Sequence, residues 1–442
     1  MLEELRMAKY RAKAEDIPTT RLIGQVTRVI GLIIEANGPA VSVGDRCIII
    51  NTFNEEISAE TVGFREQSVL LMPYGDMRGV APGCKVYSHG KPVMVRASDA
   101  LLGRVLDGFG EPMDGKGAVE GTRDCPIHRS PPNPLHRAKI VRPLVTGIRS
   151  IDSALTCGKG QRVGIFSGSG VGKSTLLGCV AKYCDADVIV VGLIGERGRE
   201  VRGFIEENLG EEGMKRSVVV VATSDQAALV RINAAWVATT IAEYFRDQGK
   251  DVLLVMDSLT RFSMAQREVG LAVGEPPATK GYTPSVFALM PKLLERAGTA
   301  EHGSITGFYT VLVEADDMND PIGDAARSIL DGHIVLSRAL ADRGHYPPVD
   351  VLASASRLLP YVTSSGHREL AYQLREALAT YREAEDLINI GAYKKGSNPR
   401  IDKSVAVMDE VTAFLRQKTE DNTAMPQMLE RLEKAMKPKA NA

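Results

Sequence analysis

Aromatic residues and paired cysteines are scarce in this chain of 442 residues. Phe, Trp and Tyr together make up 5% of the sequence, with a single Trp. The cysteines never occur as a CxxC pair, and none of the seven histidines stands beside them at a metal-ligand spacing, so we expect reduced thiols in a cytoplasmic protein and no structural zinc. The six cysteines are Cys47, Cys84, Cys125, Cys157, Cys179 and Cys184.

Net charge and long apolar runs are also lacking. The sum of 54 Lys and Arg and 55 Asp and Glu is -1, so no global basic field predicts nucleic acid or an anionic membrane as a partner. No apolar run approaches the length of a bilayer, and the first twenty residues are too charged for a signal peptide. If the protein acts at a membrane, we expect it to be recruited there.

What the chain does contain is enough apolar sequence, 44%, for two or three domains. Residues 1–19 predict a tail or a short helix. Residues 20–95 alternate short β-branched runs with turn residues, the pattern of a small β-barrel. Residues 96–360 predict a nucleotide-binding domain and contain a proline-rich stretch, Thr122–Lys139, that predicts an extended surface connector. Residues 361–442 are charged and rich in Ala and Leu, which predicts a helical domain.

The fold class of residues 96–360 follows from five buried-looking runs separated by helical stretches. This pattern is typical of an α/β fold, a parallel sheet with helices on both faces. The runs are RVGIF, VIVVGLI, SVVVVAT, VLLVMD and FYTVLVE.

A glycine-rich loop, FSGSGVGKST, joins the first of these strands to a helical stretch. Backbone amides at such a strand–loop–helix junction can surround a phosphate chain, so the loop is predicted to be a P-loop. Ser167 stands where the motif has its first glycine, which affects the tight turn more than phosphate binding. The alternative is a glycine-rich turn that happens to precede a lysine. The predicted nucleotide-binding residues are Ser169, Gly170, Val171, Gly172, Lys173, Ser174 and Thr175.

Hydrolysis also needs acidic groups near the phosphates. Asp257 ends the apolar run DVLLVMD, a Walker B pattern that could place a carboxylate near magnesium, although apolar strands also end in Asp as a helix cap. The strand VIVVGLI delivers Glu196 to the same sheet edge as the P-loop, which makes it the candidate base. Glu200 is the competing carboxylate, and both could instead be surface charges.

Several long motifs resemble those of the ATPases of type III protein export, relatives of the catalytic β subunit of rotary ATP synthases. They include GERGREV, DSLTRF, GEPPATKGYTPSVF and SRALADRGHYPPVDVLASASR, and the resemblance covers almost the whole chain. GFREQSVLLMPYGDMRGVAPG and AYKKGSNPRID look more like the flagellar ATPase than its virulence-secretion cousins. The resemblance implies a RecA-like core, ATP and Mg²⁺ as cofactors, and a homohexameric ring.

The resemblance also assigns roles to side chains. It implies that Glu196 polarises the attacking water, that Arg197 contacts the phosphates, and that Ser174, Asp257 and Glu200 serve the metal, partly through water. Tyr346 matches the aromatic residue that stacks on adenine, although packing beside two prolines is the plainer interpretation. Arg357 matches an arginine that reaches the γ-phosphate of a neighbouring subunit.

Partners are likewise implied by the family. Residues 268–284 would line the central channel, where Leu271, Ala272 and Val273 could surround a stalk protein; an ordinary surface loop is the alternative. A negative regulator would bind the N-terminus, and the export gate, chaperones and exported proteins would bind the ring. The family is located in the cytoplasm, peripheral to the inner-membrane export apparatus.

Three other functions fit the sequence less well. A non-catalytic rotary subunit typically carries glutamine where this chain has Glu196. A true ATP synthase β subunit is disfavoured by the short N-terminal sequence and the export-type C-terminus. A nucleic-acid translocase would need stacking aromatics and a basic groove, but residues 20–95 have only four aromatics and mixed charge, so we expect no nucleic acid partner.

Overall fold

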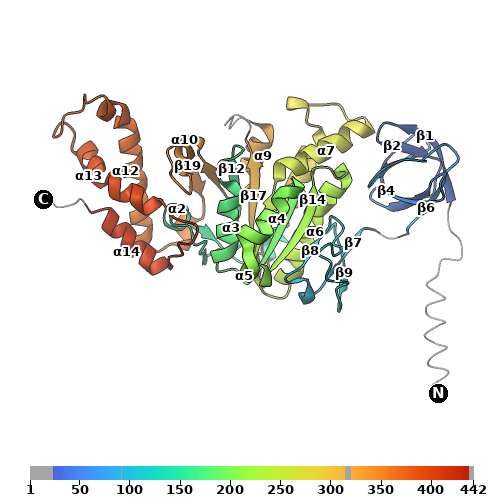
Figure 1. The fold of residues 1–442 in the computed structure, drawn as a ribbon, viewed down its shortest axis with the longest axis horizontal. Helices are drawn as coiled ribbons and strands as arrows, with labels where there is room; N and C mark the ends of the chain where they lie inside the picture. Colours follow the sequence, from blue (N-terminus) through green and yellow to red (C-terminus); the bar gives the residue numbers. More distant parts are fainter. Residues whose placement is uncertain (1–22, 91, 314–319, 438–442) are drawn as a thin grey trace, which may run out of the picture. The chain divides into compact units, whose positions relative to one another are not determined.

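The computed structural model describes residues 23–90, 92–313 and 320–437 (Figure 1). They form two compact units, the first chiefly of residues up to Val93 and the second chiefly of residues from Met94 onward. The predicted tail or short helix at residues 1–19 lies outside the described residues. No helix in the described part of the chain is long and apolar enough to cross a membrane.

The first unit contains a closed barrel of antiparallel strands in the order β1-β2-β5-β4-β3-β6. Period-two alternation creates its core: in β3, Cys47 and Ile49 are fully buried while their neighbours are half-exposed. They pack with Ile34, Leu71 and Val86 from other strands. The strands are β1 (Ile23–Ile30), β2 (Ile33–Ala36), β3 (Arg46–Ile50), β4 (Glu56–Arg65), β5 (Ser68–Pro73) and β6 (Lys85–Ser88).

The second unit is built on a nine-stranded sheet in the order β19-β18-β12-β17-β15-β13-β14-β8, with β16 pairing β17 outside this path. From β18 to β8 the neighbours along the path are parallel, and β19 is antiparallel to β18. The strands are β8 (Val105–Leu106), β12 (Arg162–Ser167), β13 (Val188–Glu196), β14 (Ser217–Thr223), β15 (Asp251–Asp257), β16 (Gly298–Thr299), β17 (Ser304–Leu312), β18 (Gly332–Leu336) and β19 (Val349–Ser356).

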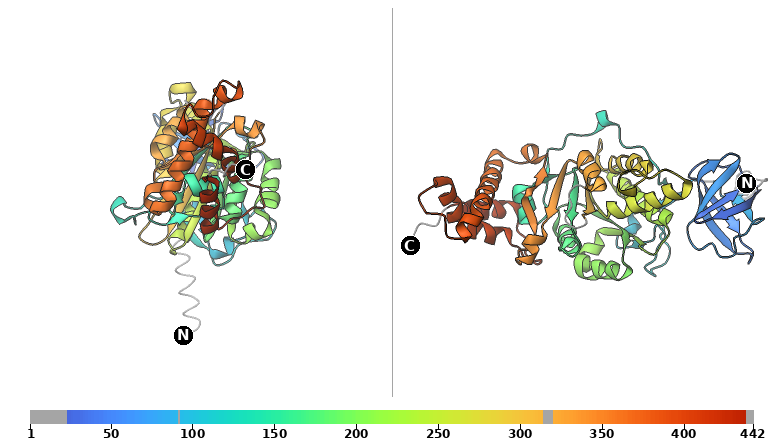
Figure 2. Two further views of the ribbon diagram at one scale, coloured as in Figure 1. Left: turned by 90° about the vertical axis from the view of Figure 1, so that its left-hand side faces the viewer. Right: turned by 90° about the horizontal axis from the view of Figure 1, so that it is seen from above.

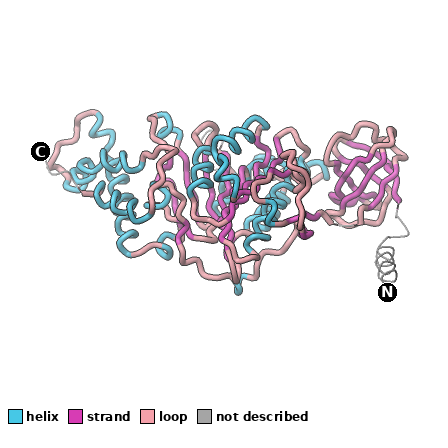
Figure 3. The backbone as a smooth tube through the Cα atoms, turned by 60° about the horizontal axis from the view of Figure 1, so that its bottom comes forward, coloured by secondary structure: helices cyan, strands magenta, loops and turns pink. Residues whose placement is uncertain are grey.

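Helices cover both faces of this sheet, which explains why its central strands are apolar on both sides (Figure 3). In β13, Val191 faces the hydrophobic cluster around α3, whereas Gly192 faces Ala238 of α6. The helices are α2 (Arg149–Ala154), α3 (Lys173–Tyr183), α4 (Gly198–Gly203), the π-helix η3 (Phe204–Leu209), α5 (Gly210–Lys215), α6 (Ala228–Arg246), α7 (Leu259–Val273), α8 (Pro284–Leu294), α9 (Pro321–Ile329), α10 (Arg338–Asp342) and α11 (Leu359–Val362).

Three C-terminal helices, α12 (Ser365–Asn389), α13 (Pro399–Leu415) and α14 (Met425–Ala435), pack on one another and on α2 (Figures 1 and 2). They follow the last strand of the sheet, β19, and are drawn in red. Barrel, parallel sheet and helical region confirm the fold class predicted from the sequence.

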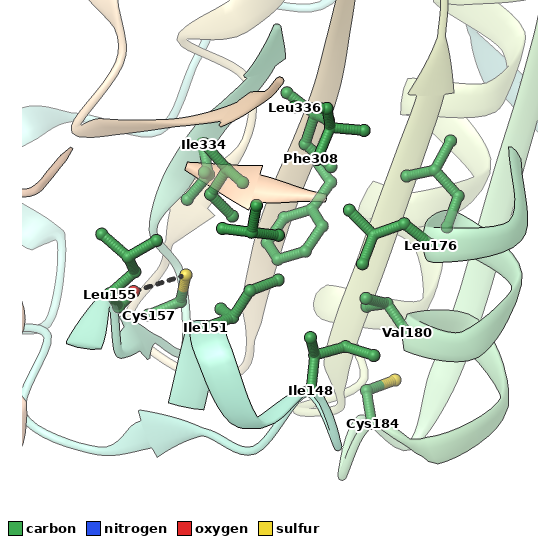
Figure 4. Close-up of a cluster of buried hydrophobic side chains, with 14 of the residues drawn as sticks. Ile148, Ile151, Leu155, Cys157, Leu176, Val180, Cys184, Phe308, Ile334 and Leu336 are labelled. Atoms are coloured by element: carbon green, nitrogen blue, oxygen red, sulfur yellow. Dashed lines mark hydrogen bonds between the residues drawn. The ribbon is translucent and has the colours of Figure 1, made fainter. Parts of the chain in front are cut away.

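One continuous core joins the P-loop helix to these C-terminal helices. Figure 4 shows its central part, where Leu176 and Val180 of α3 face Ile148, Ile151 and the sheet. The same cluster extends to residues of all three C-terminal helices. Movement of the C-terminal region therefore disturbs packing directly beneath the P-loop.

Two local expectations were wrong. The proline-rich stretch is not an extended connector throughout: β9 (Arg123–Pro126) pairs with β7 (Met94–Ala97), and Cys125 and Ile127 are buried. Leu271, Ala272 and Val273 belong to α7 and not to a loop, because the turn-forming Gly274 and the two prolines come only after them.

The remaining short elements are β10 (Pro143–Leu144), β11 (Cys157–Gly158) and the 3-10 helices η1 (Asp99–Leu101), η2 (Pro134–His136) and η4 (Thr279–Gly281). All six cysteines are free thiols.

A buried ion pair stabilises the face of the sheet that α6 covers. Arg296 is fully buried and donates two hydrogen bonds to Glu243 of α6, from Nη2 at 2.7 Å and from Nε at 2.9 Å. Its guanidinium also bonds Thr240 Oγ1 and lies over the Trp236 ring. Every polar contact of this arginine is thus made inside the protein.

Replacing Glu243 with Ala should lower the unfolding temperature by roughly 5 °C, because an unpaired buried charge costs about 3–5 kcal/mol and the unit that contains it is large. Differential scanning calorimetry measures this shift. Glu385→Ala is the control: it breaks the exposed Arg343–Glu385 pair at 2.9 Å, which should contribute less than about 1 kcal/mol. Equal shifts in the two variants would contradict the importance assigned to the buried pair.

Candidate active site

The P-loop lies between the end of β12 and the start of α3. Gly172, the N-cap residue of α3, has a φ of 94°, a left-handed conformation that favours glycine. The helix has no side-chain cap, so its first-turn amides are available to an anion. Of the loop residues, Val171 is buried, whereas Ser169, Gly170, Ser174 and Thr175 are exposed.

The substitution at Ser167 has a simple structural explanation. Ser167 is the last residue of β12 and pairs with Leu312 on one side and Leu336 on the other. An extended strand position does not need glycine, so the serine leaves the loop intact. Its buried hydroxyl has no hydrogen-bond partner among the residues that the structure describes.

Two acidic side chains from neighbouring strands surround the ammonium of Lys173. Its Nζ forms a short contact with Asp257 Oδ1, at the end of β15, and lies 3.7 Å from Glu196 Oε1, at the end of β13. The three side chains are 4 to 16% exposed. The predicted P-loop lysine, Walker B acid and candidate base are therefore brought together.

A bulge at the end of β13 precedes Glu196. The register with β14 shifts between Ile194 and Glu196, and Gly195 between them has a φ of 71°. A Cβ on Gly195 would lie 2.8 Å from Cβ of Arg261, so only glycine fits here. The bulge re-aims the strand end, as bulges beside active sites commonly do.

The carboxyl group of Glu196 is strongly perturbed. Burial raises its pKa to about 7, and the negative charge of Asp257 acts in the same direction. The neighbouring Glu200 also favours the protonated form, and Lys173 opposes the shift. A carboxyl with a pKa near neutrality can accept a proton during catalysis at ordinary pH.

Arg197 and Glu200 lie beside this cluster but largely in solvent. Arg197 Nη1 donates to Glu200 Oε1 at 3.2 Å, and the two side chains are 65 and 42% exposed. In this state each partly neutralises the other, and neither touches the P-loop.

A pocket of about 700 Å³ extends from the P-loop helix to the C-terminal region. Thr175 and Leu176 of α3 form one side, Tyr346 and the two following prolines another, and the segment Arg416–Asp421 a third. Tyr346 is half-exposed and, among the described residues, is the only aromatic residue that lines the pocket. Its shape and position suit a nucleobase attached to phosphates in the P-loop.

Arg357 lies near the amino-terminal ends of the parallel strands, whereas the P-loop follows the carboxyl end of β12. It follows Ser356, which pairs with Gly332, and Gly332 pairs with Val163 near the start of β12. The loop begins only after Ser167, about 13 Å further along the strand. The chain therefore does not bring Arg357 to its own phosphate site.

Three family models match successive parts of the chain. They are the ATP synthase alpha/beta family beta-barrel domain over residues 26–90, that family's nucleotide-binding domain over residues 147–356, and the T3SS EscN ATPase C-terminal domain over residues 363–434. The flagellum-specific ATP synthase of Bacillus subtilis is 56% identical over 400 residues, covering 90% of this chain and 91% of that protein. The chain belongs to the flagellar and type III secretion ATPase family.

Relatives from the type III secretion branch are also similar to this chain. The type 3 secretion system ATPase of Sinorhizobium fredii is 50% identical, with 92% of this chain and 91% of that protein covered. The assembled ATPase EscN of enteropathogenic E. coli is 46% identical and superposes with a TM-score of 0.90, covering 94% of this chain and all of that one. The resemblance stated from the sequence motifs is confirmed.

Sequence reasoning missed three residues that contact the site of this ATPase. Thr310 Oγ1 donates to Asp257 Oδ1 at 2.6 Å, and Arg338 Nη2 donates to the Ser169 carbonyl of the P-loop at 3.0 Å. Arg261 packs against Gly195. Arg261 and Arg338 lie within motifs quoted for the resemblance, whereas no pattern singled out Thr310 inside an apolar strand.

The ATPase should lose kcat/KM for ATP as the pH falls through about 7. The free enzyme's Glu196 is protonated below its raised pKa and then cannot accept a proton, so activity should fall roughly tenfold per pH unit on the acid side. Steady-state rates at saturating Mg²⁺ measure this limb. A midpoint near the ordinary glutamate value of 4.5 would show that the perturbation has no kinetic role.

Proposed function

We propose that this protein is a flagellar export ATPase that hydrolyses ATP as a ring of six copies to energise protein export. The observation that carries the catalytic part is the buried Lys173–Asp257–Glu196 cluster directly beside a P-loop. The flagellar assignment rests on the quoted motifs and on the 56% identity to a flagellum-specific relative. A virulence secretion ATPase is the alternative, supported by the 50% identity to the Sinorhizobium protein.

The chemistry assigned to the cluster is water attack on the γ-phosphate. The loop Ser169–Thr175 holds the phosphate chain through its amides, and the Lys173 ammonium turns from the two acids to the β- and γ-phosphates. Glu196, released from the lysine, orients the attacking water and accepts its proton. Arg197 contributes positive charge to the phosphates once it leaves Glu200.

The donor set suits magnesium. The hydroxyl of Ser174 is exposed at the start of α3 and the Asp257 carboxylate is held by Thr310, giving the oxygen ligands that this ion prefers. Glu200 is assigned to waters around the ion. When bound, Mg²⁺ would neutralise charge on the phosphates. Among the described residues, no cluster of three or more His, Cys, Asp or Glu forms a site made by the protein alone, which fits a metal held jointly with phosphate.

Tyr346 is assigned to the adenine base, since its ring lines the pocket that opens next to the P-loop. Arg357 is assigned to the active site of a neighbouring copy, because it is exposed and lies at the far edge of its own sheet. In a ring, each interface could bring the P-loop of one copy together with Arg357 of the next, which accounts for the distance between the two within one chain. The related EscN ATPase has been solved in assembled form.

The partners proposed are those of an export machine. EscN has also been solved in complex with its central stalk EscO. EscN in that complex superposes on the present chain with a TM-score of 0.87, which supports a stalk protein as a partner of this chain. A regulator at the N-terminus, the export gate, chaperones and exported proteins, but no nucleic acid, complete the set. The location proposed is the cytoplasm, peripheral to the inner-membrane export apparatus.

Glu196→Gln should reduce ATP turnover about a hundredfold or more with little change in ATP affinity, since the amide keeps the shape and loses the base. Cells carrying this variant as their only copy should secrete no flagellar subunits. Lys173→Ala should lose binding and turnover together. Near wild-type turnover in Glu196→Gln would move the base to Glu200, and normal flagellar secretion would refute the export assignment.

Arg357→Ala should lower turnover about a thousandfold or more while leaving ATP affinity nearly intact, the effect of losing an arginine that meets the transferring phosphoryl group. Mixing it with Lys173→Ala subunits should restore part of the activity, because some interfaces then combine an intact loop with an intact arginine. Wild-type turnover by Arg357→Ala that still forms rings would show that the arginine has a structural role only.

A further inference from the structure

The base pocket has a wall that comes from the far end of the chain. Residues 416–421 follow α13 and contain no aromatic side chain, so Tyr346 offers the pocket its only aromatic face. The wall formed by residues 416–421 can therefore recognise the base only through polar groups and shape. Its position must be fixed if it is to contribute to binding.

Two buried side chains hold this wall in place. Arg149, at the start of α2, is 6% exposed, and Gln417 is 9% exposed. The Arg149 guanidinium donates to the carbonyls of Phe414, at 2.7 Å, and of Arg416, and it lies 3.7 Å from Asp421 Oδ2. Every hydrogen bond and ion pair of the Arg149 side chain within the described residues is thus to the C-terminal segment.

Gln417 completes the connection in both directions. Its Oε1 accepts from the Arg149 amide at 2.8 Å, and its Nε2 donates to the carbonyls of Gly147 and Asp421, each at 2.7 Å. Its own amide donates to the Tyr346 carbonyl at 2.8 Å. One residue therefore connects the polar wall, the start of α2 and the residue that faces the base.

We infer that Arg149 and Gln417 are positioning residues for nucleobase binding, and that they couple base binding to docking of the C-terminal helices on the P-loop domain. This inference rests on the proposed ATP site. Within the described residues, the hydrogen bonds and ion pair of these two side chains involve no P-loop residue, so they act on the base and not on the phosphates. Reciprocity then requires that the base, once bound, stabilises the docked segment.

Two ligands separate base binding from phosphate binding: ATP and inorganic tripolyphosphate, each with Mg²⁺. Arg149→Met and Gln417→Leu in the full-length protein should weaken ATP about tenfold, the factor that corresponds to the loss of one or two net hydrogen bonds. Tripolyphosphate affinity should change less than about twofold. Isothermal titration calorimetry measures both, and the steady-state readout is a raised KM for ATP with a nearly unchanged kcat.

The control variant is Arg382→Met. Arg382 of α12 donates to Asp350 of β19 at 3.0 Å, so it also connects the C-terminal helices to the P-loop domain, but it does not line the base pocket. ATP and tripolyphosphate affinities should both stay at wild-type values. If Arg382→Met weakens ATP as much as Arg149→Met does, any loosening of the C-terminal region suffices and the inference is wrong.

A further test uses the wild-type protein alone, so its outcome does not depend on whether a variant folds. In hydrogen exchange, ATP should protect the amides of residues 416–421, and tripolyphosphate should not. Equal protection by both ligands, or by neither, would overturn the coupling, as would equal losses of ATP and tripolyphosphate binding in the variants. If the wild-type protein bound neither ligand, the proposed function would fail instead, which distinguishes the two failures.

Discussion

The position of the Lys173 ammonium between two buried carboxylates is the interaction on which the active site depends. Asp257 and Glu196 are both held at the ends of adjacent parallel strands, where two acids a few ångströms apart would repel strongly without a cation. Lysine supplies that charge from the P-loop. On the proposed assignment, the phosphates of ATP would compete with the two carboxylates for the lysine, so the same arrangement would respond to nucleotide.

Much of the fold could be predicted because its strands are buried on both faces and read as apolar runs. Several other strands are not marked by a continuous apolar run. β4, with the sequence EISAETVGFR, buries only Ala59 and Thr61, and β19 lies at the sheet edge with alternating exposure. β8 has only two residues, too few for any periodicity, and is defined by pairing with β14.

The site was predictable as far as it consists of local motifs. Lys173, Glu196 and Asp257 each follow a recognisable strand, and parallel strands bring their carboxyl ends to one edge. Thr310, Arg149 and Gln417 could not be found in this way, because their roles come from contacts with residues as far as 53 to 270 positions away. Periodicity and spacing contain no information about such contacts.

The separation of Arg357 from the P-loop by the full length of β12 has a consequence for how the enzyme is controlled. If Arg357 completes the site of a neighbouring copy, as proposed, catalysis would depend on how many copies are assembled together. Separate chains would then hydrolyse little ATP, and a scaffold that concentrates them would switch the activity on. Synthesis of the protein could thus precede its assembly with little consumption of ATP.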